Sequence, residues 1–558
     1  MMKSIISYLQ KHVLLVILLL SLLPLVALLK PGLPVTHDGQ DHVARIANFY
    51  LSLKEGNLVP RWAANLNWGY GHPILMFLYP LPSYIASLFH FIGLNLVDST
   101  KLVFGLAFIA SAVTMYIWMN TAFGSTAALL GALLYAFAPY RFVDLYVRGD
   151  LGEHVAFVFP PLVFYFLYTI AHQIKKNRNQ IGNGIGLTFS FAALIMAHNA
   201  IAVMFLPIIL LYMVYLFFTE TENRWLAIGY SASFLALGFG LAAFFWIPAY
   251  FEGKYTLRDI VTAGEALKRF VPWQWFFYSP WNYGGGDQLT KSLGFPQWFG
   301  IIVSLILLIQ VKDRKIRILL VGTLILLLAS LFIMTSWSAF FWKTITFLQK
   351  FQFPWRFLAV SLFCAAVLGG VGISNMFRAP KNLRMGVCVV CVIWILGATI
   401  PMWHPRAYQV IDQTFYSGIY PSTTDTGESS PIWSVRFMEH GPIHNLEVVD
   451  GVADITVIRR NTTDHEYFVV AHKPTLMMEN TVYFPGWAIS VDGTPAQIQY
   501  QNPNYRGLMM FDVPAGRHTI EVKFGATKLR QVADLISLLS LGMLAAAGIG
   551  GFVWQKRK

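Results

Sequence analysis

The sequence predicts a polytopic α-helical membrane protein of about 12 spans, with a β-sandwich-like domain outside the membrane near the C-terminus. Three observations support this fold class. The 558 residues are 56% hydrophobic and 12% charged, which is about half the charged share of a soluble domain. Long apolar runs recur along the chain. Between residues 403 and 530 these runs give way to polar stretches in which apolar and polar residues alternate.

The apolar runs give the individual spans. The first run, about 12–30, follows basic residues and is not followed by a small-residue cleavage site, so we interpret it as a span rather than a signal peptide. The remaining spans are expected at about 101–121, 125–140, 155–173, 185–198, 200–219, 225–247, 297–311, 316–336, 356–377, 385–402 and 533–554.

The segment 74–94 decides the topology. It is apolar enough for a span, but its prolines and aromatic residues also suit a helix that lies in the membrane interface. If it does not cross, the basic clusters at 175–178, 312–317, 378–384 and 556–558 all lie on the cytoplasmic side. We therefore expect a cell-membrane protein with a large outer loop over 31–100 and with both termini in the cytoplasm. The net charge of +13 then reflects topology rather than nucleic-acid binding.

The polar C-terminal part is predicted to form antiparallel strands. Stretches such as "LEVVDGVADITVIRR" and "WAISVDGTPAQIQY" alternate with period two around Asp-Gly turns. We divide the chain into a transmembrane region (1–402), an extracytoplasmic β-rich domain (403–530), and a final helix with a basic tail (531–558).

Ionisable residues crowd into "THDGQDHVARI" (36–46), directly after the first apolar run. In a helix that begins near Asp38, the side chains of Asp38, Asp41, His42 and Arg45 share one face. A pair of carboxylates on one face suits a general base or a divalent metal, Mg²⁺ or Mn²⁺. The alternative is that Asp38 is an N-cap and Asp41 faces the helix dipole, which leaves His42 and Arg45 unexplained.

A second group lies in "VRGDLGEH", between two expected spans, and contains Arg148, Asp150, Glu153 and His154. Because it is expected on the same side of the membrane as Asp38, it is a candidate part of one site. The alternative is a solvated loop with an internal Arg148–Asp150 pair.

A third group is "LQKFQFPWRF", in which Lys350 and Arg356 flank aromatic residues. Cations among aromatic rings suit the phosphate of a lipid, although the sequence alone slightly favours an aromatic belt with a snorkelling arginine. His198, at the end of a span, and Tyr70, which could stack on a sugar, are weaker candidates because helix contacts or interface anchoring also explain them.

Together, "HDGQDHVARI", "YVRGDLGEH", "FQFPWRF" and the many spans resemble the GT-C superfamily of membrane glycosyltransferases. More narrowly, the chain resembles the bacterial 6-pyruvoyl-tetrahydropterin-synthase-related membrane proteins and the neighbouring YfhO-like proteins. The stretch "YFPGWAISVDGTPAQIQYQNPNYRGLMMFDVPAGRHTIEVKF" resembles the outer β-domain of the latter. The chain lacks the histidine-rich set that zinc-dependent pterin chemistry needs.

The GT-C resemblance implies transfer of a sugar from a polyprenyl-phosphate donor to an extracytoplasmic glycan or polymer. The matching acids are Asp38, with Asp41 as its rival, and Glu153 or Asp150. The cations matching a lipid phosphate are Arg356 and Lys350. Residues expected near the substrates are His42, Arg45, Tyr70, Arg148 and His198. "HDGQDH" departs from a simple Asp-x-Asp pattern, so metal dependence stays open. A lipid-linked glycan transporter or flippase and a non-catalytic envelope assembly protein remain alternatives, but the ionisable groups cluster at the expected outer edge, which favours the enzyme.

Overall fold

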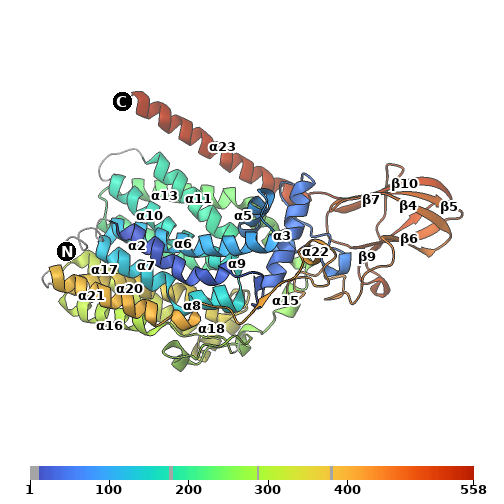
Figure 1. Ribbon diagram of the computed structural model, residues 1–558. Coiled ribbons are helices and arrows are strands. Elements are labelled where there is room, and N and C mark those ends of the chain that lie inside the picture. Colours follow the sequence, from blue (N-terminus) through green and yellow to red (C-terminus); the bar gives the residue numbers. More distant parts are fainter. Residues whose placement is uncertain (1–11, 175–179, 286–287, 377–380, 558) are drawn as a thin grey trace.

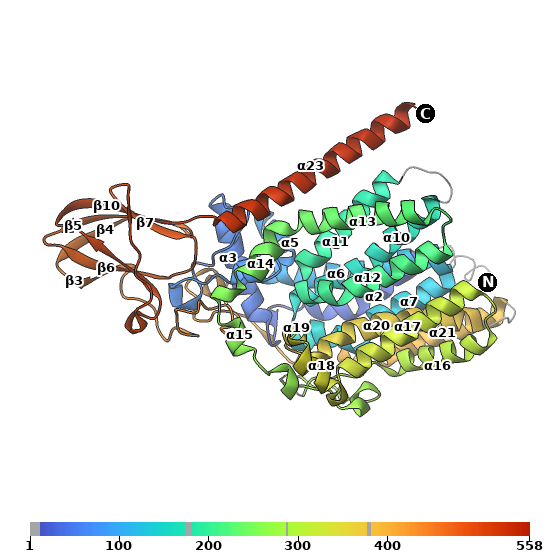
Figure 2. The ribbon, with the colours of Figure 1, turned by 180° about the vertical axis from the view of Figure 1, so that it is seen from behind.

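The computed structural model describes residues 12–174, 180–285, 288–376 and 381–557. Figure 1 shows a bundle of helices with the β-strands gathered at one end of it. The last helix, α23 (Lys528–Arg557), runs from the strands back alongside the bundle. Figure 2 shows the same arrangement from behind. The predicted fold class, a helical membrane protein with a C-terminal β-region, is therefore confirmed.

Six of the described helical segments are long and apolar enough to cross a membrane. They contain α6 (Leu96–Phe123), α9 and α10 (Leu151–Ala156 and Phe159–Ile174), α12 (Asn199–Thr219), α17 (Arg314–Ile333), η8 and α20 (Pro354–Phe357 and Leu358–Met376), and α23.

Two bent pairs raise this number to eight if each pair forms one span. The first joins α7 (Ser125–Ala136) to α8 (Pro139–Phe142) and the π-helical turn η3 (Val143–Arg148), with a bend of 48°. The second joins α13 (Arg224–Leu241) to α14 (Ala243–Phe251), with a bend of 67°.

Shorter apolar helices complete the set: α2 with η1 (Val13–Leu22 and Leu23–Leu29), α11 (Ile181–Ala197), α16 (Phe295–Gln310) and α21 (Lys381–Gly397). Every predicted span overlaps one of these segments, and the count of about 12 stays a prediction. The predicted sidedness also stays a prediction, since Lys175, Lys176, Arg178 and Arg378 lie outside the described residues.

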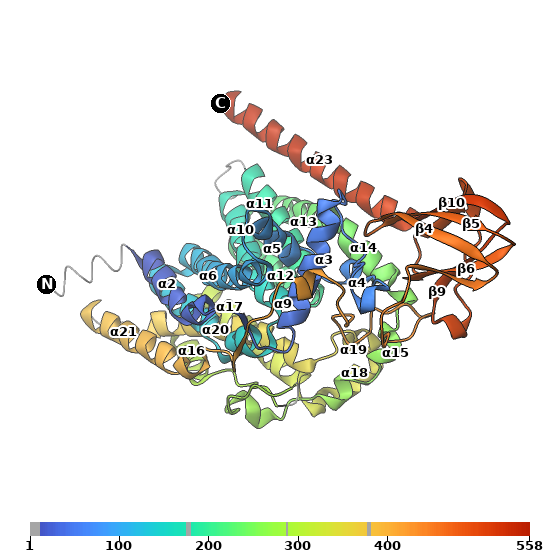
Figure 3. The same ribbon diagram turned by 45° about the vertical axis from the view of Figure 1, so that its right-hand side comes forward.

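Further helices lie between the apolar segments and before the strands of the two sheets. They are α3 (Gly39–Lys54), α4 (Ile74–Phe77), α5 (Leu81–Phe91), α15 (Arg258–Val261), α18 (Ala339–Thr344), α19 (Thr346–Gln349) and α22 (Thr414–Ser417). Figures 1 and 3 both show α3 between the bundle and the β-region. The segment 74–94 contains α4 and α5, of four and eleven residues, and a helix needs about 20 residues to span a membrane. No single helix of spanning length forms there, in agreement with the prediction.

The β-region consists of two antiparallel sheets. One has the order β4-β5-β10-β7-β8 and the other β3-β6-β9. The strands are β3 (Leu446–Asp450), β4 (Ala453–Arg460), β5 (Asp464–Ala471), β6 (Thr475–Val482), β7 (Trp487–Val491), β8 (Thr494–Ala496), β9 (Leu508–Val513) and β10 (Gly516–Phe524). Alternate residues of both sheets, such as Val469, Met477 and Phe511, share one buried core. The alternation in the sequence produced this pattern because successive strand side chains face opposite sides.

The strands of the two sheets lie in the later part of the predicted domain 403–530. They begin at Leu446, whereas residues 403–445 form the two-residue strand β2 (Tyr408–Gln409), helix α22 and irregular backbone. Strand β2 pairs with β1 (Leu33–Pro34), at the start of the first loop. This part of the chain therefore packs on the first loop instead of joining the sheets.

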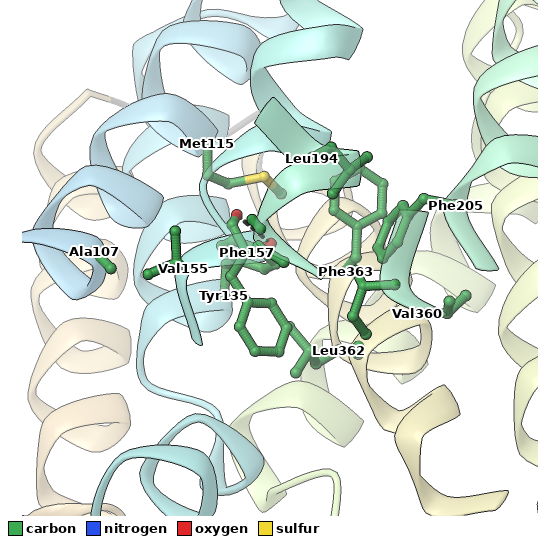
Figure 4. Close-up of a cluster of buried hydrophobic side chains, with 14 of the residues drawn as sticks. Ala107, Met115, Tyr135, Val155, Phe157, Leu194, Phe205, Val360, Leu362 and Phe363 are labelled. Atoms are coloured by element: carbon green, nitrogen blue, oxygen red, sulfur yellow. Dashed lines mark hydrogen bonds between the residues drawn. The ribbon is translucent and has the colours of Figure 1, made fainter. Parts of the chain in front are cut away.

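The core of the bundle is formed by buried apolar and aromatic side chains from several helices. In Figure 4, Tyr135, Phe157 and Phe363 lie among aliphatic side chains from several helices. The Tyr135 hydroxyl donates a hydrogen bond of 2.8 Å to the Phe157 carbonyl. This packed layer fixes α9, whose first residues carry the acidic motif 148–154.

Candidate functional site

Two segments more than a hundred residues apart meet at the start of α3. The backbone N–H groups of His37 and Asp38 donate to the carbonyls of Val147 and Arg148 at 3.0 and 2.8 Å. Gly149 follows with a φ of +66°, and a Cβ atom there would lie 2.2 Å from the Thr36 Oγ1 atom. Only glycine fits this approach. The turn at Gly149 thus places Asp38 beside the second acidic motif.

Asp38 is the carboxylate left available by this arrangement. It stands at the N-cap position of α3 but its side chain makes no capping hydrogen bond, since the Thr36 Oγ1 atom accepts from the Gly39 N–H at 3.1 Å instead. The part of the chain that the structure describes offers no hydrogen bond to the Asp38 carboxylate, which stays partly exposed. Burial and the nearby Asp150 carboxylate raise the pKa of Asp38, although Arg148 and Arg45 act in the opposite direction.

The other three side chains of the first motif are engaged within the protein. The Tyr420 hydroxyl donates to Asp41 at 3.2 Å. Arg45 is buried and donates through Nε to the Thr424 hydroxyl at 2.9 Å. The Nε2 atom of His42 accepts from the Leu151 N–H at 3.3 Å, and burial, with the nearby Arg45, lowers the pKa of His42 to about 3. These contacts clamp residues 403–445 and α9 onto α3.

Arg148 is the centre of the second motif. Its guanidinium contacts Asp144 at 2.6 Å, Asp150 at 2.5 Å and Glu153 at 2.8 Å, and all four side chains are buried. The Arg148–Asp150 pair is present as the sequence suggested, but the alternative of a solvated loop for this motif is wrong. The chain is buried from α8 through α9, and it is helical except at the turn formed by Gly149 and Asp150. The cation compensates the acids, which makes their burial tolerable.

Asp150 and Glu153 are fixed by further hydrogen bonds. Asp150 Oδ1 accepts from the Glu153 N–H at 3.0 Å and caps α9, and it also accepts from the Tyr79 hydroxyl at 3.2 Å. The Tyr140 hydroxyl donates to Glu153 at 2.7 Å. Burial raises the pKa of Asp150, but the Arg148 guanidinium and other nearby cations outweigh it and hold this pKa well below its usual range. Asp150 is therefore an ordered anion.

A divalent metal does not fit this donor set. One oxygen each of Asp150 and Glu153 and one nitrogen of His198 lie within 4.8 Å of one another. Arg148 already hydrogen-bonds both carboxylates, and the Nδ1 atom of His198 accepts from the Ile201 N–H at 3.3 Å. The guanidinium thus takes the place of a metal cation. Among the described residues, Asp38 and Asp41 belong to no such group of three, so we assign no step to a metal.

A cavity of about 480 Å³ opens beside the acids. Apolar walls come from α11, α12, α13 and α14, which Figure 2 shows as neighbouring green helices. The charged lining of the cavity is mainly basic, with four cationic side chains (Lys254, Arg258, Lys350 and Arg356) and two acids, Asp259 and Glu428. Glu428 pairs with Arg258 at 3.1 Å. Lys350 and Arg356 were predicted from the sequence. Lys254 and Arg258 were missed, and the available signal was the mixture of cations and aromatic residues in "YFEGKYTLRD".

Arg356 joins the cavity to the acids. Its Nε atom lies 3.9 Å from Glu153 Oε2 and has no hydrogen-bond partner within the described chain. Its Nη1 atom donates to the Phe351 carbonyl at 3.0 Å. Tyr79 stacks on His198 with ring centroids 4.7 Å apart, and both rings line the cavity. The basic lining of the cavity thus directly adjoins the acids.

Tyr70 lies elsewhere. It is buried in the core shared with the strands, and its carbonyl accepts from the Val482 N–H at 3.0 Å. The structure therefore brings together Asp38, His42, Arg45, Arg148, Asp150, Glu153, His198 and Arg356, with Asp41 and Lys350 at the margins, but not Tyr70.

Residues 75–405 match the family described as 6-pyruvoyl-tetrahydropterin synthase related domain, membrane protein. The chain is 25% identical over 224 residues to an uncharacterized protein of Lactococcus lactis subsp. cremoris (strain MG1363). That match covers 38% of this chain and 35% of the relative, so the chain spans about a third of the length of the curated relative that it matches.

Three solved membrane proteins have partly similar structures. The mycobacterial arabinofuranosyltransferase AftD matches 71% of this chain and 28% of its own, at 13% identity and a TM-score of 0.43. The oligosaccharyltransferase of Archaeoglobus fulgidus matches 74% and 56%, at 14% identity and 0.41. ArnT from Cupriavidus metallidurans, solved with undecaprenyl phosphate, matches 74% and 67%, at 13% identity and 0.39.

Proposed function

The chain belongs to the family of 6-pyruvoyl-tetrahydropterin synthase related membrane proteins, and from that premise we propose that it is a membrane glycosyltransferase. The donor is a polyprenyl-phosphate sugar and the acceptor is a glycan or polymer of the cell envelope, outside the membrane. The observation that carries the proposal is the cavity that combines apolar walls, a mainly basic charged lining and adjoining carboxylates.

The cavity suits a lipid phosphate. Phe191 and Ile195 of α11 and Leu206 of α12 supply apolar walls for an isoprenoid chain. In the basic lining, Lys350 and Lys254 have no carboxylate partner among the described residues, so their charge is available to a phosphate. Hydrogen bonds from a cation to a phosphate are short and about twice as strong as neutral ones. A donor bound in this way places its sugar toward Tyr79 and the acids.

Asp38 is the proposed general base. Its carboxylate accepts the proton of the acceptor hydroxyl, and the acceptor oxygen forms a bond to the anomeric carbon. The bond between that carbon and the phosphate oxygen breaks, and its electron pair leaves with the polyprenyl phosphate. The raised pKa of Asp38 makes it a stronger base than an ordinary aspartate. Arg356 stabilises the charge that develops on the departing phosphate.

Asp150, Glu153 and Arg148 are proposed as positioning residues. Arg148 holds both acids in place in the interior, and its own carbonyl accepts from the Asp38 N–H at 2.8 Å. Asp150 and Glu153 also set the electrostatic field at Asp38 and Arg356. Their substitution is therefore expected to reduce transfer through the placement of these two residues.

Transfer from a panel of radiolabelled polyprenyl-phosphate sugars tests the proposal. Purified wild-type protein is compared with Asp38→Asn, and Asp412→Asn is the matched control because that acid is exposed in the 403–445 segment and bonded to Thr414. We expect the wild type and the control to release label from the lipid. Asp38→Asn should be slower by a factor of about 100 or more, the usual scale for losing a general base.

Other outcomes contradict the proposal. Release at the wild-type rate by Asp38→Asn removes Asp38 as the base. No release from any donor, by protein that remains folded, contradicts the glycosyltransferase and favours a transporter or an assembly protein. Movement of intact lipid-linked glycan across vesicles, without release of sugar, would identify the transporter.

A further inference from the structure

A second cavity, of about 390 Å³, lies where the first loop meets the β-region. Its walls come from the end of α3, from residues 64–69, and from the loops that precede β3 and follow β4. Its polar and aromatic side chains are Glu55, Asn65, Trp68, Asn445, Arg460 and Asn461. The volume lies within the range of about 300–1,000 Å³ that is common for small-ligand sites. Nothing in the proposed transfer step uses this cavity.

The backbone is strained where Trp68 enters the wall. Trp68 has φ 61° and ψ 21°, and Asn67 before it has φ 54°. A left-handed conformation is sterically unfavourable for a residue other than glycine. The cost is offset by hydrogen bonds of 3.0 Å from the Trp68 and Asn67 N–H groups to the carbonyls of Tyr420 and Ser422. Strain that is held in place by its surroundings is typical of binding sites.

The two charged side chains of the cavity, Glu55 and Arg460, are already hydrogen-bonded within the protein. Glu55 Oε2 accepts from the Thr462 N–H at 2.8 Å. Arg460 Nη1 donates to Glu479 and to the Tyr467 hydroxyl, each at 2.6 Å. Arg460 is therefore paired with an acid, whereas Glu55 has no ion-pair partner among the described residues and would repel an anionic ligand.

Amide groups are the polar groups left available. Within the described chain, the side chains of Asn445 and Asn461 have no hydrogen-bond partner, while Asn65 donates to the Ser417 carbonyl at 2.9 Å. Each asparagine amide offers two donors and an acceptor. This combination matches a ligand that is rich in hydroxyl groups and carries no charge.

We propose that this cavity is a carbohydrate-binding site for an uncharged sugar chain. The Trp68 indole would pack against the apolar C–H face of a sugar ring, and Asn445 and Asn461 would bond its hydroxyls. The cavity is separate from the lipid cavity, with which it shares no lining residue. That the bound chain is the acceptor of the transferred sugar rests on the proposed function, whereas carbohydrate binding does not.

Binding is measured directly, without turnover. Full-length protein in detergent is titrated with neutral oligosaccharides of three to six hexose units, and binding is followed by saturation-transfer NMR. Wild type should bind at least one of them. Trp68→Ala and Asn445→Ala should weaken binding about tenfold or more, whereas Trp68→Phe, which retains an aromatic face, should stay within about threefold.

Matched controls distinguish the cavity from the rest of the surface. Trp273→Ala removes an exposed tryptophan outside the cavity, and Asn504→Ala an exposed asparagine of the β-region. Both should bind as the wild type does.

Three results overturn the inference: no neutral oligosaccharide binds, binding is unchanged in Trp68→Ala, or the protein prefers an anionic polymer with an affinity that falls with salt. A protein that binds sugars but releases none from lipid donors refutes only the proposed function. One that transfers sugar yet fails this titration refutes only the second site.

Discussion

Replacing Arg148 with methionine tests the central charge arrangement of the site. Arg148 contacts three buried carboxylates at 2.5–2.8 Å, and its own side chain is 7% exposed. Breaking a buried ion pair by removing one partner costs about 3–5 kcal/mol, because a charge is left uncompensated. Since Arg148→Met leaves three acids, we expect a loss near the upper end, about 5 kcal/mol.

Thermal unfolding in detergent gives the measurement. At about 2 °C per kcal/mol for a large chain, this loss corresponds to a fall of roughly 10 °C in the unfolding temperature. Arg459→Met is the matched control. Arg459 also contacts two carboxylates, Asp464 at 2.8 Å and Glu466 at 3.3 Å, but its side chain is 44% exposed. Exposed pairs are worth about 1 kcal/mol or less, so this variant should unfold within about 2 °C of the wild type.

A second substitution separates charge from packing. Asp144→Asn, added to Arg148→Met, removes one of the uncompensated acids and should recover part of the lost stability. The reasoning is refuted if Arg148→Met unfolds within about 2 °C of the wild type. It is also refuted if the double variant is less stable than Arg148→Met alone, because the acids would then not depend on the arginine.

Three further predictions concern transfer. Gly149→Ala should reduce transfer at least tenfold, because a Cβ atom would lie 2.2 Å from Thr36 Oγ1. The control Gly56→Ala, also at positive φ but with nothing within 4 Å of the added Cβ atom, should keep its activity. Equal rates in the two variants would contradict the role of the Gly149 turn. Only ionised Asp38 accepts a proton, and its pKa is raised. The transfer rate should therefore fall on acidification with a midpoint above about 4, the ordinary aspartate value. A pH–rate profile with a midpoint at or below that value would contradict this prediction. Arg356→Gln should weaken binding of polyprenyl phosphate about tenfold or more in a vesicle-binding assay. Lys343→Gln, which changes an exposed lysine outside the cavity, should not weaken it. Similar losses in both variants would show only a general charge effect.

Local sequence patterns were sufficient for the elements of the fold. An apolar run must bury or enter lipid wherever it lies, so the spanning helices could be located from hydropathy alone. Alternation over 446–524 requires strands for the same reason, since one face of each strand must be buried. The crowding of Asp38, Asp41, His42 and Arg45 into one helical face also follows from spacing, and α3 does begin at Gly39.

Contacts between side chains that are distant in the sequence could not be predicted from these local patterns. Asp38 and Asp41 look alike in the sequence, but Tyr420 bonds Asp41, whereas the Asp38 carboxylate has no hydrogen-bond partner among the described residues. Lys254 and Arg258 join Lys350 and Arg356 only because the segment after α14 and the segment after α19 border the same cavity. Tyr70 was grouped with the site by its aromatic character, yet packing draws it into the core of the β-region.

The sequence by itself therefore determined the fold class, the approximate spans and the two acidic motifs of this protein. Only the tertiary structure decided which of these charges compensate one another and which remain available. The physical reason is that hydropathy and periodicity act between neighbours in the chain. A buried charge instead depends on whichever partner the packing brings within about 3 Å, and for Asp38 and Arg148 that packing joins segments more than a hundred residues apart.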